Sequence, residues 1–239
     1  MTRARPPVAR IRRLRDDRRG LALIEFAFAA PLVLALGLYG VEMGNQALTH
    51  MRVSQIALSV ADNASRMGDI QTSNIEQFRE GDMNDVFQAA RLQGAGIKIG
   101  TFGRITVSSL ENVQQSYDTA PVQRIHWQRC LGAMTGAAYG SSYGTTGANA
   151  GATATVADAG TAAPQGMGDS GRMVTAPAGY GLIFVEVNYQ YQPIVSGWLA
   201  KPFRMHYVAS MIVRNARDFR QIYNPLTSAT PSTCNRYAA

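Results

Sequence analysis

An unbroken apolar run near the N-terminus is the strongest hydrophobic pattern in the chain. From Leu21 to Gly44 nearly every residue is apolar or small, and Glu25 and Glu42 are the only charged side chains. About 20 consecutive apolar residues make a helix long enough to cross a bilayer. The pattern therefore predicts a membrane-spanning helix over 21–44. Pro31 removes one backbone donor inside it, which favours a kink of the kind that membrane helices tolerate.

A second helical pattern follows directly. Over 45–67 the apolar residues recur every third or fourth position, and polar residues fill the other face. This spacing is typical of an amphipathic helix with one buried face. The apolar set is Val53, Ile56, Ala57, Val60, Ala64 and Met67. We expect the helix to continue beyond the membrane, to carry a domain on this face and to stop near Gly68.

Two shorter helices are expected next. The string from Ser73 to Glu76 matches a capping box and predicts a short helix, which Gly81 interrupts. Asp82 is then expected to cap a further helix that ends at Gly94.

The hydrophobic period changes to two in the second half of the chain. Four stretches alternate: one around Ile105 and Val107, then 123–130, 183–191 and 203–213. Such alternation predicts an antiparallel sheet of about four strands with one covered face. In the second stretch, Gln123, Ile125, Trp127 and Arg129 are expected to share a face. Helices followed by strands give the expected fold class, α+β, with residues 45–239 as one domain outside the membrane.

A long stretch rich in Gly, Ala, Ser and Thr separates the second and third predicted strands, at about 132–179. It contains few large apolar residues and is expected to be loop or disordered. We interpret it as a solvated insertion, with a functional surface loop as the alternative.

The charge of the chain is concentrated before the apolar run. The formal net charge is +7, and residues 1–20 contain eight arginines against Asp16 and Asp17, which leaves only +1 for the rest. No basic stripe or DNA-binding motif follows, so the sequence argues against nucleic-acid binding. Arginines before a spanning segment predict a cytoplasmic N-terminus and an external C-terminal domain. Residues 1–20 are thus a leader, expected to be disordered until processed or bound to the inner leaflet.

The chain contains two cysteines, Cys130 and Cys234. A disulfide is their one intrachain pairing, and an exported domain can hold it. The alternative is two free thiols, which are less expected outside the cytoplasm. Closing a loop of this size would stabilise the fold by about 4–5 kcal/mol in the chain-entropy model.

The residues around the start of the apolar run resemble a known processing site. Arg18-Arg19-Gly20 followed by Leu21 to Phe26 is similar to a type IV prepilin peptidase site, where the cut follows glycine and glutamate is the fifth mature residue. Leu21 stands where many prepilins have phenylalanine. The resemblance implies cleavage between Gly20 and Leu21 and methylation of the new amine.

The wider pattern resembles the TadE-like family of tight-adherence pilus proteins. The similarity rests on Gly20, Glu25-Phe26-Ala27, Pro31, Gly37, Glu42 and Gly44, with softer matches at 127–130, 187–193 and 209–215. It implies a pilin-like fold and a minor pilin or pseudopilin in a bacterial inner membrane with a periplasmic domain. The implied partners are the prepilin peptidase, other pilins or pseudopilins, the inner-membrane assembly platform and membrane lipid. Glu25, Phe26, Pro31 and Glu42 are the implied assembly residues.

Within this interpretation Glu25 is the candidate that determines assembly. A carboxylate in apolar surroundings is costly unless it is paired. The positive N-terminal amine of a neighbouring subunit is its natural partner. The alternative is an uncleaved single-span protein that scaffolds the machinery, with Glu25 paired to another membrane segment.

Two other export signals match the sequence only in part. Ala27-Phe28-Ala29 supplies a signal-peptidase string, but Pro31 would lie close to the new end and the apolar run continues to Val41. Arg18-Arg19 resembles a twin-arginine signal without its usual flanking residues. An exported soluble domain is thus a third class of function.

Motifs for catalysis are weak. Gly168-Asp169-Ser170-Gly171 matches the string around a protease nucleophile, but none of the three histidines has the matching context. The glycines at 94, 96 and 100 do not have dinucleotide-loop spacing, and no His/Cys cluster has metal-ligand spacing. We expect no enzyme activity, no cofactor and no metal.

Overall fold

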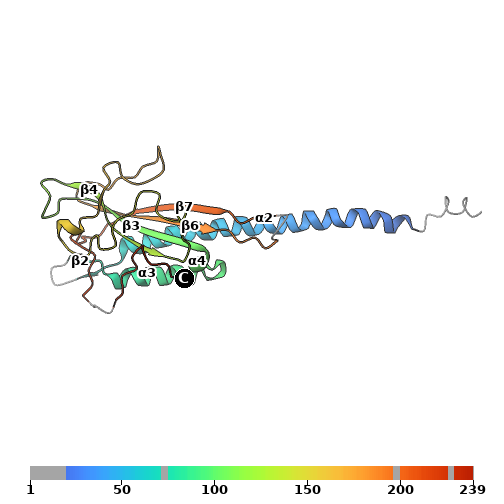
Figure 1. The fold of residues 1–239 in the computed structure, drawn as a ribbon, viewed down its shortest axis with the longest axis horizontal. Helices are drawn as coiled ribbons and strands as arrows, with labels where there is room; N and C mark the ends of the chain where they lie inside the picture. The colour runs from blue at the N-terminus through green and yellow to red at the C-terminus, as the bar shows by residue number, and fades with distance from the viewer. Residues whose placement is uncertain (1–19, 71–74, 196–199, 226–228, 239) are drawn as a thin grey trace, which may run out of the picture.

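A computed structural model describes residues 20–70, 75–195, 200–225 and 229–238. The predicted leader, apart from Gly20, lies outside the described residues. The helix α2, Leu21–Arg66, is continuous over 46 residues and includes Pro31. Its first half projects from a compact head, and its second half lies along that head (Figure 1).

The amphipathic half of α2 has the predicted buried face. All six predicted apolar residues except Met67 are buried, and Met67 packs partly buried against the same core. The helix ends just before Gly68, with the Met67 N–H bonded to the Asn63 carbonyl. The buried Arg217 guanidinium also donates to the carbonyls of Ala64 and Met67, so unpaired carbonyls at the helix end have a partner.

The helix predicted from the capping box at 73–76 is wrong for the part that is described. Ser73 and Asn74 lie outside the described residues, and Glu76 begins the strand β2, Glu76–Gln77. It pairs antiparallel with β1, Asp69–Ile70. The Glu76 N–H also bonds to the Ala216 carbonyl. Partners distant in sequence therefore determine the local backbone here, and a capping-box string cannot reveal them.

The next helix, α3, Glu80–Gln93, ends at Gly94 as predicted but starts earlier. Gly81 lies inside the helix, so the predicted interruption is wrong. Asp82 is the third helical residue, and its carboxylate accepts from the N–H of the capping residue Arg79 at 2.9 Å. A glycine inside a helix costs only about 1 kcal/mol relative to alanine, which this capping interaction helps to offset. Two short helices follow, η1, Ala95–Ile97, and α4, Ile99–Phe102.

A five-stranded sheet forms the centre of the head. Its strands are β3, Gly103–Val113, β4, Val122–Leu131, β5, Thr161–Ala162, β6, Gly181–Gln190, and β7, Arg204–Ile212. They lie in the order β5-β4-β3-β6-β7, and every neighbouring pair is antiparallel. Strands lie at all four predicted stretches, but the predicted count of about four is not confirmed, because the sheet has five strands. The short fifth strand, β5, lies in the Gly/Ala-rich stretch, where the sequence has no alternation of apolar and polar residues that would predict a strand.

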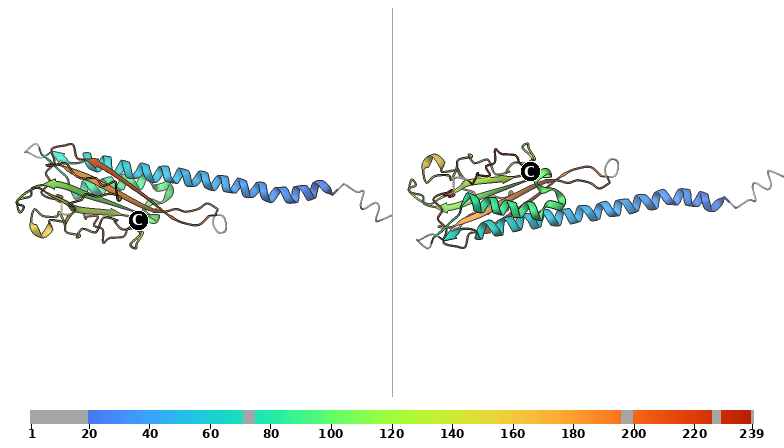
Figure 2. Two further views of the ribbon diagram at one scale, coloured as in Figure 1. Left: turned by 90° about the horizontal axis from the view of Figure 1, so that it is seen from above. Right: turned by 90° about the horizontal axis from the view of Figure 1, so that it is seen from below.

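The two longer helices cover one face of the sheet (Figure 2). α2 lies against β6 and β7, and α3 packs against α2. Phe78 stacks on Trp127 of β4 with ring centroids 5.4 Å apart. The apolar face of β6 and the residue just after the strand fill this core with Ile183, Val185, Val187, Tyr189 and Tyr191.

The Gly/Ala-rich stretch covers the other face of the sheet. A second apolar cluster there contains Met167, which is fully buried, together with Leu182 and Phe184 of β6. Tyr143 packs edge-on against Phe184 at 4.9 Å. The stretch is irregular, with one 3-10 turn, η2, Val156–Asp158. It is a loop, as predicted. Most of its residues are exposed or half-buried, but a few, such as Met167 and Ala176, are buried against the sheet.

A β-bulge in β4 changes which side chains of that strand share a face of the sheet. The register between β3 and β4 shifts at Ser109/Leu110, so that Trp127 lies opposite Ser109 and Ile125 lies opposite Leu110. Trp127 consequently joins the helix-side core and Ile125 joins the loop-side cluster. The extra residue, His126, is buried beside Glu111, with its Nδ1 2.6 Å from the carboxylate. The prediction that Ile125 and Trp127 share a face is thus wrong.

Candidate functional site

The projecting half of α2 exposes large apolar side chains on every side. Phe28 is 76% exposed, and no residue of the most apolar 18-residue window is buried inside the head. A helix that is apolar all round must be buried in a membrane or among other helices. The exposed apolar residues before Glu42 are Leu21, Leu23, Ile24, Phe26, Phe28, Leu32, Val33, Leu34, Leu36, Leu38, Tyr39 and Val41.

The length of this segment matches a bilayer. From Leu21 to Val41 the helix rises by about 31 Å at 1.5 Å per residue, and a hydrocarbon core is about 30 Å thick. In the described part of the chain, α2 is the helix that is long and apolar enough to cross a membrane. Glu42 is therefore the first residue past the apolar segment.

The predicted processing residues lie at the free end of this helix. Gly20 is the N-cap of α2, and its carbonyl accepts from the Ile24 N–H at 3.2 Å. Leu21 is 54% exposed, and a Cβ on Gly20 would meet nothing within 4 Å. The bond between Gly20 and Leu21 is thus accessible and lies far from the head (Figure 1).

Glu25 and Phe26 lie one turn further along the helix, on its open surface. Glu25 is exposed, and no hydrogen bond or ion pair joins it to the described residues. Phe26 beside it is 70% exposed. Glu25 is the one charged side chain between Leu21 and Val41. Glu25 and Glu42 therefore lie in different environments, Glu25 exposed and Glu42 buried.

Glu42 is bound by the head. Its carboxylate accepts from the Tyr191 hydroxyl at 2.6 Å and from the N–H groups of Ile194 and Val195 at 3.0 and 2.9 Å. Glu42 is only 3% exposed. Three donors, the Tyr191 hydroxyl just after β6 and two N–H groups of the following segment, thus hold the Glu42 carboxylate against the domain.

Further contacts extend this attachment of α2 to the sheet. The Asn45 amide donates to the Tyr191 hydroxyl at 2.7 Å, and His50 Nδ1 lies 2.8 Å from the Tyr207 hydroxyl. Burial, together with the Glu42 carboxylate, raises the pKa of the Tyr191 hydroxyl to about 12. Tyr191 therefore remains protonated and donates to Glu42 throughout the physiological range. We call Glu42, Asn45 and Tyr191, with the N–H groups of Ile194 and Val195, the Glu42 clasp.

The predicted disulfide between Cys130 and Cys234 is present. It attaches the C-terminal tail, 229–238, to the edge of β4, where the Cys130 N–H also bonds to the Ser232 carbonyl. The buried Arg104 guanidinium donates to the carbonyls of Cys234 and Arg236. The tail thus covers a strand edge that would otherwise be open for pairing.

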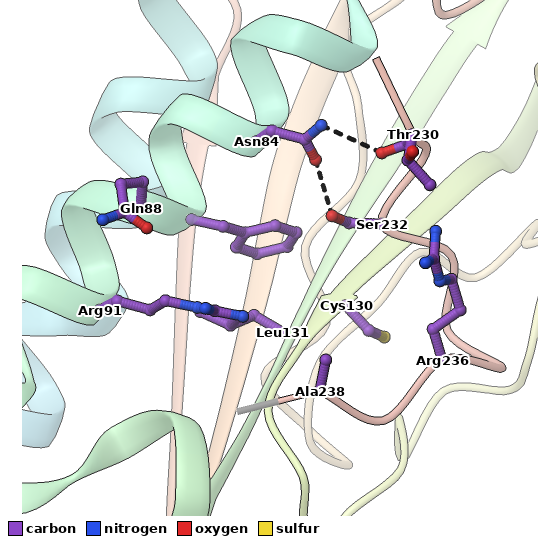
Figure 3. A pocket seen from close by; sticks show the side chains of 10 residues that line it. Asn84, Gln88, Arg91, Cys130, Leu131, Thr230, Ser232, Arg236 and Ala238 are labelled. Carbon is purple, nitrogen blue, oxygen red and sulfur yellow. Dashed lines mark hydrogen bonds between the residues drawn. The ribbon is translucent and has the colours of Figure 1, made fainter. Parts of the chain in front are cut away.

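A pocket of about 270 Å³ lies between α3 and the C-terminal residues, beside the tail (Figure 3). Asn84 on α3 bonds to the Thr230 carbonyl and accepts from the Ser232 hydroxyl, which closes one side. The pocket is lined by Asn84, Phe87, Gln88, Arg91, Cys130, Leu131, Thr230, Ser232, Arg236 and Ala238. It lies beside the disulfide and away from the Glu42 clasp.

The described residues do not assemble the catalytic groups considered from the sequence. His50 bonds to Tyr207, His126 lies against Glu111, and His206 Nδ1 lies 2.7 Å from Asn188. None of these described contacts involves Ser170. Among the described residues there is also no group of three or more His, Cys, Asp or Glu side chains placed to hold a metal ion.

The sequence identified Glu42 but missed its partners. Tyr191 is 149 residues away, and its pattern signalled only an inward-facing strand residue. Two of the donors are backbone N–H groups, which have no signature in the sequence. Arg104 was missed for a similar reason, because its acceptors are backbone carbonyls of the tail.

Comparisons of this chain with protein-family models, curated proteins and solved structures found no match.

Proposed function

We propose that this protein is a minor pilin or pseudopilin of a tight-adherence pilus system in a bacterial inner membrane. The observation that carries the proposal is the projecting half of α2, which is apolar on every side, about one bilayer long and interrupted by the single charge of Glu25. It extends from an α+β head in which a long helix covers an antiparallel sheet (Figure 1). The resemblance of residues 20–44 to the TadE-like family supports the same role.

In this proposal the arginine-rich leader keeps the N-terminus in the cytoplasm, and the head folds in the periplasm. A prepilin peptidase cuts between Gly20 and Leu21, where the chain is exposed at the helix end. The processed helix then moves from the lipid into contact with other pilin helices and the assembly platform. These surroundings replace lipid around an apolar helix without exposing it to water.

Glu25 supplies the pairing specificity in this mechanism. It has no hydrogen-bond partner in the described part of its own chain, and a carboxylate in apolar surroundings is costly until a cation compensates it. The free amine at Leu21 of a neighbouring processed subunit provides that cation. Glu42 differs because its own chain already satisfies it. The role of Glu42 is therefore to attach the helix to the head.

The test is the N-terminal sequence and intact mass of the protein recovered from membranes. We expect a start at Leu21, with the mass of one added methyl group. Gly20→Ala should block the cut, and Gly37→Ala is the matched control, because neither added Cβ meets another atom within 4 Å. Unprocessed wild-type protein starting at Met1 would contradict the proposal and support an uncleaved single-span scaffold.

Glu25→Ala tests the assembly step separately. We expect this variant to be processed like the wild type and to leave cells without assembled pili. Normal piliation by Glu25→Ala would contradict the pairing role of Glu25.

A further inference from the structure

The pocket between α3 and the C-terminal tail is lined by two arginines from opposite walls. Arg91 comes from the last turn of α3, and Arg236 comes from the tail (Figure 3). In the part of the chain that the structure describes, no acidic side chain lines the pocket. The two guanidinium groups therefore border a common space to which these residues bring no negative charge.

Both arginines keep N–H donors for a ligand. Arg91 is half-buried and forms no hydrogen bond or ion pair with the described residues. The Arg236 guanidinium donates one bond, to the Pro231 carbonyl at 3.2 Å, although a guanidinium has five N–H donors. Other arginines of the described chain pair with carboxylates, namely Arg66, Arg79, Arg124, Arg129 and Arg220. The pocket thus contains cationic groups that lack the usual acidic partner.

The rest of the lining combines apolar side chains with neutral polar groups. Phe87 and Leu131 belong to the buried core and also border the pocket. Asn84 accepts from the Ser232 hydroxyl at 2.7 Å, so these two polar side chains already bond to each other. One part of the pocket therefore suits an apolar group, and the part at the two arginines suits an anion.

Backbone contacts and the disulfide hold the tail wall of the pocket in place. The Cys130 N–H bonds to the Ser232 carbonyl at 2.7 Å, and the Gly132 N–H bonds to the Ala238 carbonyl at 3.1 Å. The disulfide between Cys130 and Cys234 lies between these two bonds along the tail. A ligand would therefore enter a preformed site, which lowers the entropy cost of binding.

The size of the pocket and the geometry of arginine restrict the ligand. A volume of about 270 Å³ is below the range of about 300–1,000 Å³ for drug-sized ligands, so the ligand is small. A carboxylate matches the guanidinium fork, because it accepts two parallel N–H bonds. The apolar lining beside the arginines calls for an apolar group on the same molecule.

We propose that this pocket binds an organic carboxylate that carries an apolar side chain. Arg91 and Arg236 bind the carboxylate, and Phe87 and Leu131 contact the side chain. The C-terminal residue of a polypeptide and a free N-acylated amino acid share this chemistry. The proposal concerns the head alone and is independent of the role proposed for α2.

An NMR titration of the full chain in detergent micelles tests the proposal. The probe is N-acetyl-leucine, and the methyl signals of Leu131 and Ala238, which line the pocket, report binding. We expect saturable shifts of both signals with a Kd of about 1–10 mM, the range for a ligand of this size. N-acetyl-leucinamide has the same shape without the charge and should give no saturable shift.

Two variants locate the binding at the arginines. Arg91→Gln and Arg236→Gln should each weaken the binding of N-acetyl-leucine about tenfold, because each removes charge-assisted N–H donors. Arg172→Gln is the matched control, since Arg172 is exposed and lies outside the pocket. It makes the same change in net charge and should leave the Kd unchanged.

Other results overturn the proposal. Absent shifts, equal binding of N-acetyl-leucinamide, or an unchanged Kd in either pocket variant would exclude a carboxylate site formed by the two arginines. Acetate or inorganic phosphate that binds as tightly as N-acetyl-leucine would exclude a contribution from the apolar lining.

A longer probe distinguishes the two sources of such a ligand. Tighter binding of N-acetyl-Ala-Ala-Leu than of N-acetyl-leucine would support the proposal and identify the end of a polypeptide as the ligand. Equal or weaker binding of this peptide would support it with a free amino-acid derivative as the ligand.

Discussion

The Tyr191 hydroxyl and the Glu42 carboxylate lie 2.6 Å apart and join the end of β6 to the point where α2 leaves the head. The contact is enclosed, with Glu42 3% and Tyr191 1% exposed. This hydrogen bond links the projecting helix to the sheet. The attachment of the projecting half of α2 to the sheet thus includes a hydrogen bond between residues 149 positions apart in sequence.

Tyr191→Phe tests this attachment. The variant keeps the ring and removes one donor from a buried carboxylate, so we expect a loss of about 1–3 kcal/mol in the free energy of unfolding. The measurement is urea denaturation of the full chain in detergent micelles. Tyr180→Phe, the same change at a tyrosine that is 50% exposed, is the control and should leave stability unchanged. Equal stability of the two variants would contradict a contribution from the clasp.

The disulfide and Arg104 hold the same tail by independent means. Replacing Cys130 and Cys234 together with serine opens a loop of 104 residues and should cost about 4–5 kcal/mol in the chain-entropy model. We expect the tail to stay docked, because Arg104 still donates to the carbonyls of residues 234 and 236.

Amide hydrogen exchange at Cys130 and Gly132 measures this docking, because their N–H groups bond to tail carbonyls. Protection should fall moderately in the double-serine variant and be lost when Arg104→Met is added. Complete loss of protection in the double-serine variant alone would show that Arg104 does not hold the tail.

The sequence predicted the elements whose signal is local. The apolar run and the amphipathic face defined α2 almost to its last residue, because helix burial repeats every three to four positions. The alternation in β6 and β7 likewise predicted their buried faces, confirmed by Val185 and Met205 in the core. These patterns depend on residues within one element.

The missed features depend on contacts between elements. The bulge that turns Ile125 away from Trp127 comes from the register with β3, which alternation within β4 cannot show. The Gly/Ala-rich stretch covers a sheet face because Leu182 and Phe184 already supply the apolar surface that Met167 completes. The Glu42 clasp relies on backbone N–H groups, so the acceptor was visible in the sequence but the donors were not.

Arg129 provides a prediction about the junction of α3 with the sheet. Its guanidinium donates to the Glu80 carboxylate, with Nε 2.9 Å from Oε2, and the two side chains are 1% and 3% exposed. Arg129→Met leaves a buried carboxylate without its cation, so we expect a loss of about 3–5 kcal/mol in the free energy of unfolding. Adding Glu80→Met should recover most of that loss, because no unpaired charge remains.

Arg66→Met is the control for Arg129→Met. Arg66 pairs with Asp62 on the surface, where its side chain is 71% exposed, and its loss should leave the denaturation midpoint nearly unchanged. A double variant at positions 80 and 129 that is no more stable than Arg129→Met would argue against an uncompensated charge as the cause.

Glu186 gives the protein a predictable dependence on pH. It is fully buried on the loop side of β6, and burial raises the pKa of its carboxyl, although Ser141 and the Ser142 N–H bond to it. A carboxyl whose pKa is higher in the folded than in the unfolded state contributes to stability. That contribution is fully present at a pH below the pKa of the unfolded chain. This contribution is lost as pH rises through the folded pKa, because the unfolded chain ionises first.

Glu186→Gln removes that ionisation and keeps an oxygen that can accept from both donors. We therefore expect the variant to gain stability relative to the wild type as pH rises from about 4 to 7, with a smaller difference at the acidic end. Thermal unfolding of both proteins across this range measures the difference. Glu76→Gln, at a half-buried glutamate, is the matched control for the change from glutamate to glutamine itself. A difference between Glu186→Gln and wild type that is constant across the range would show that the ionisation of Glu186 does not change on folding.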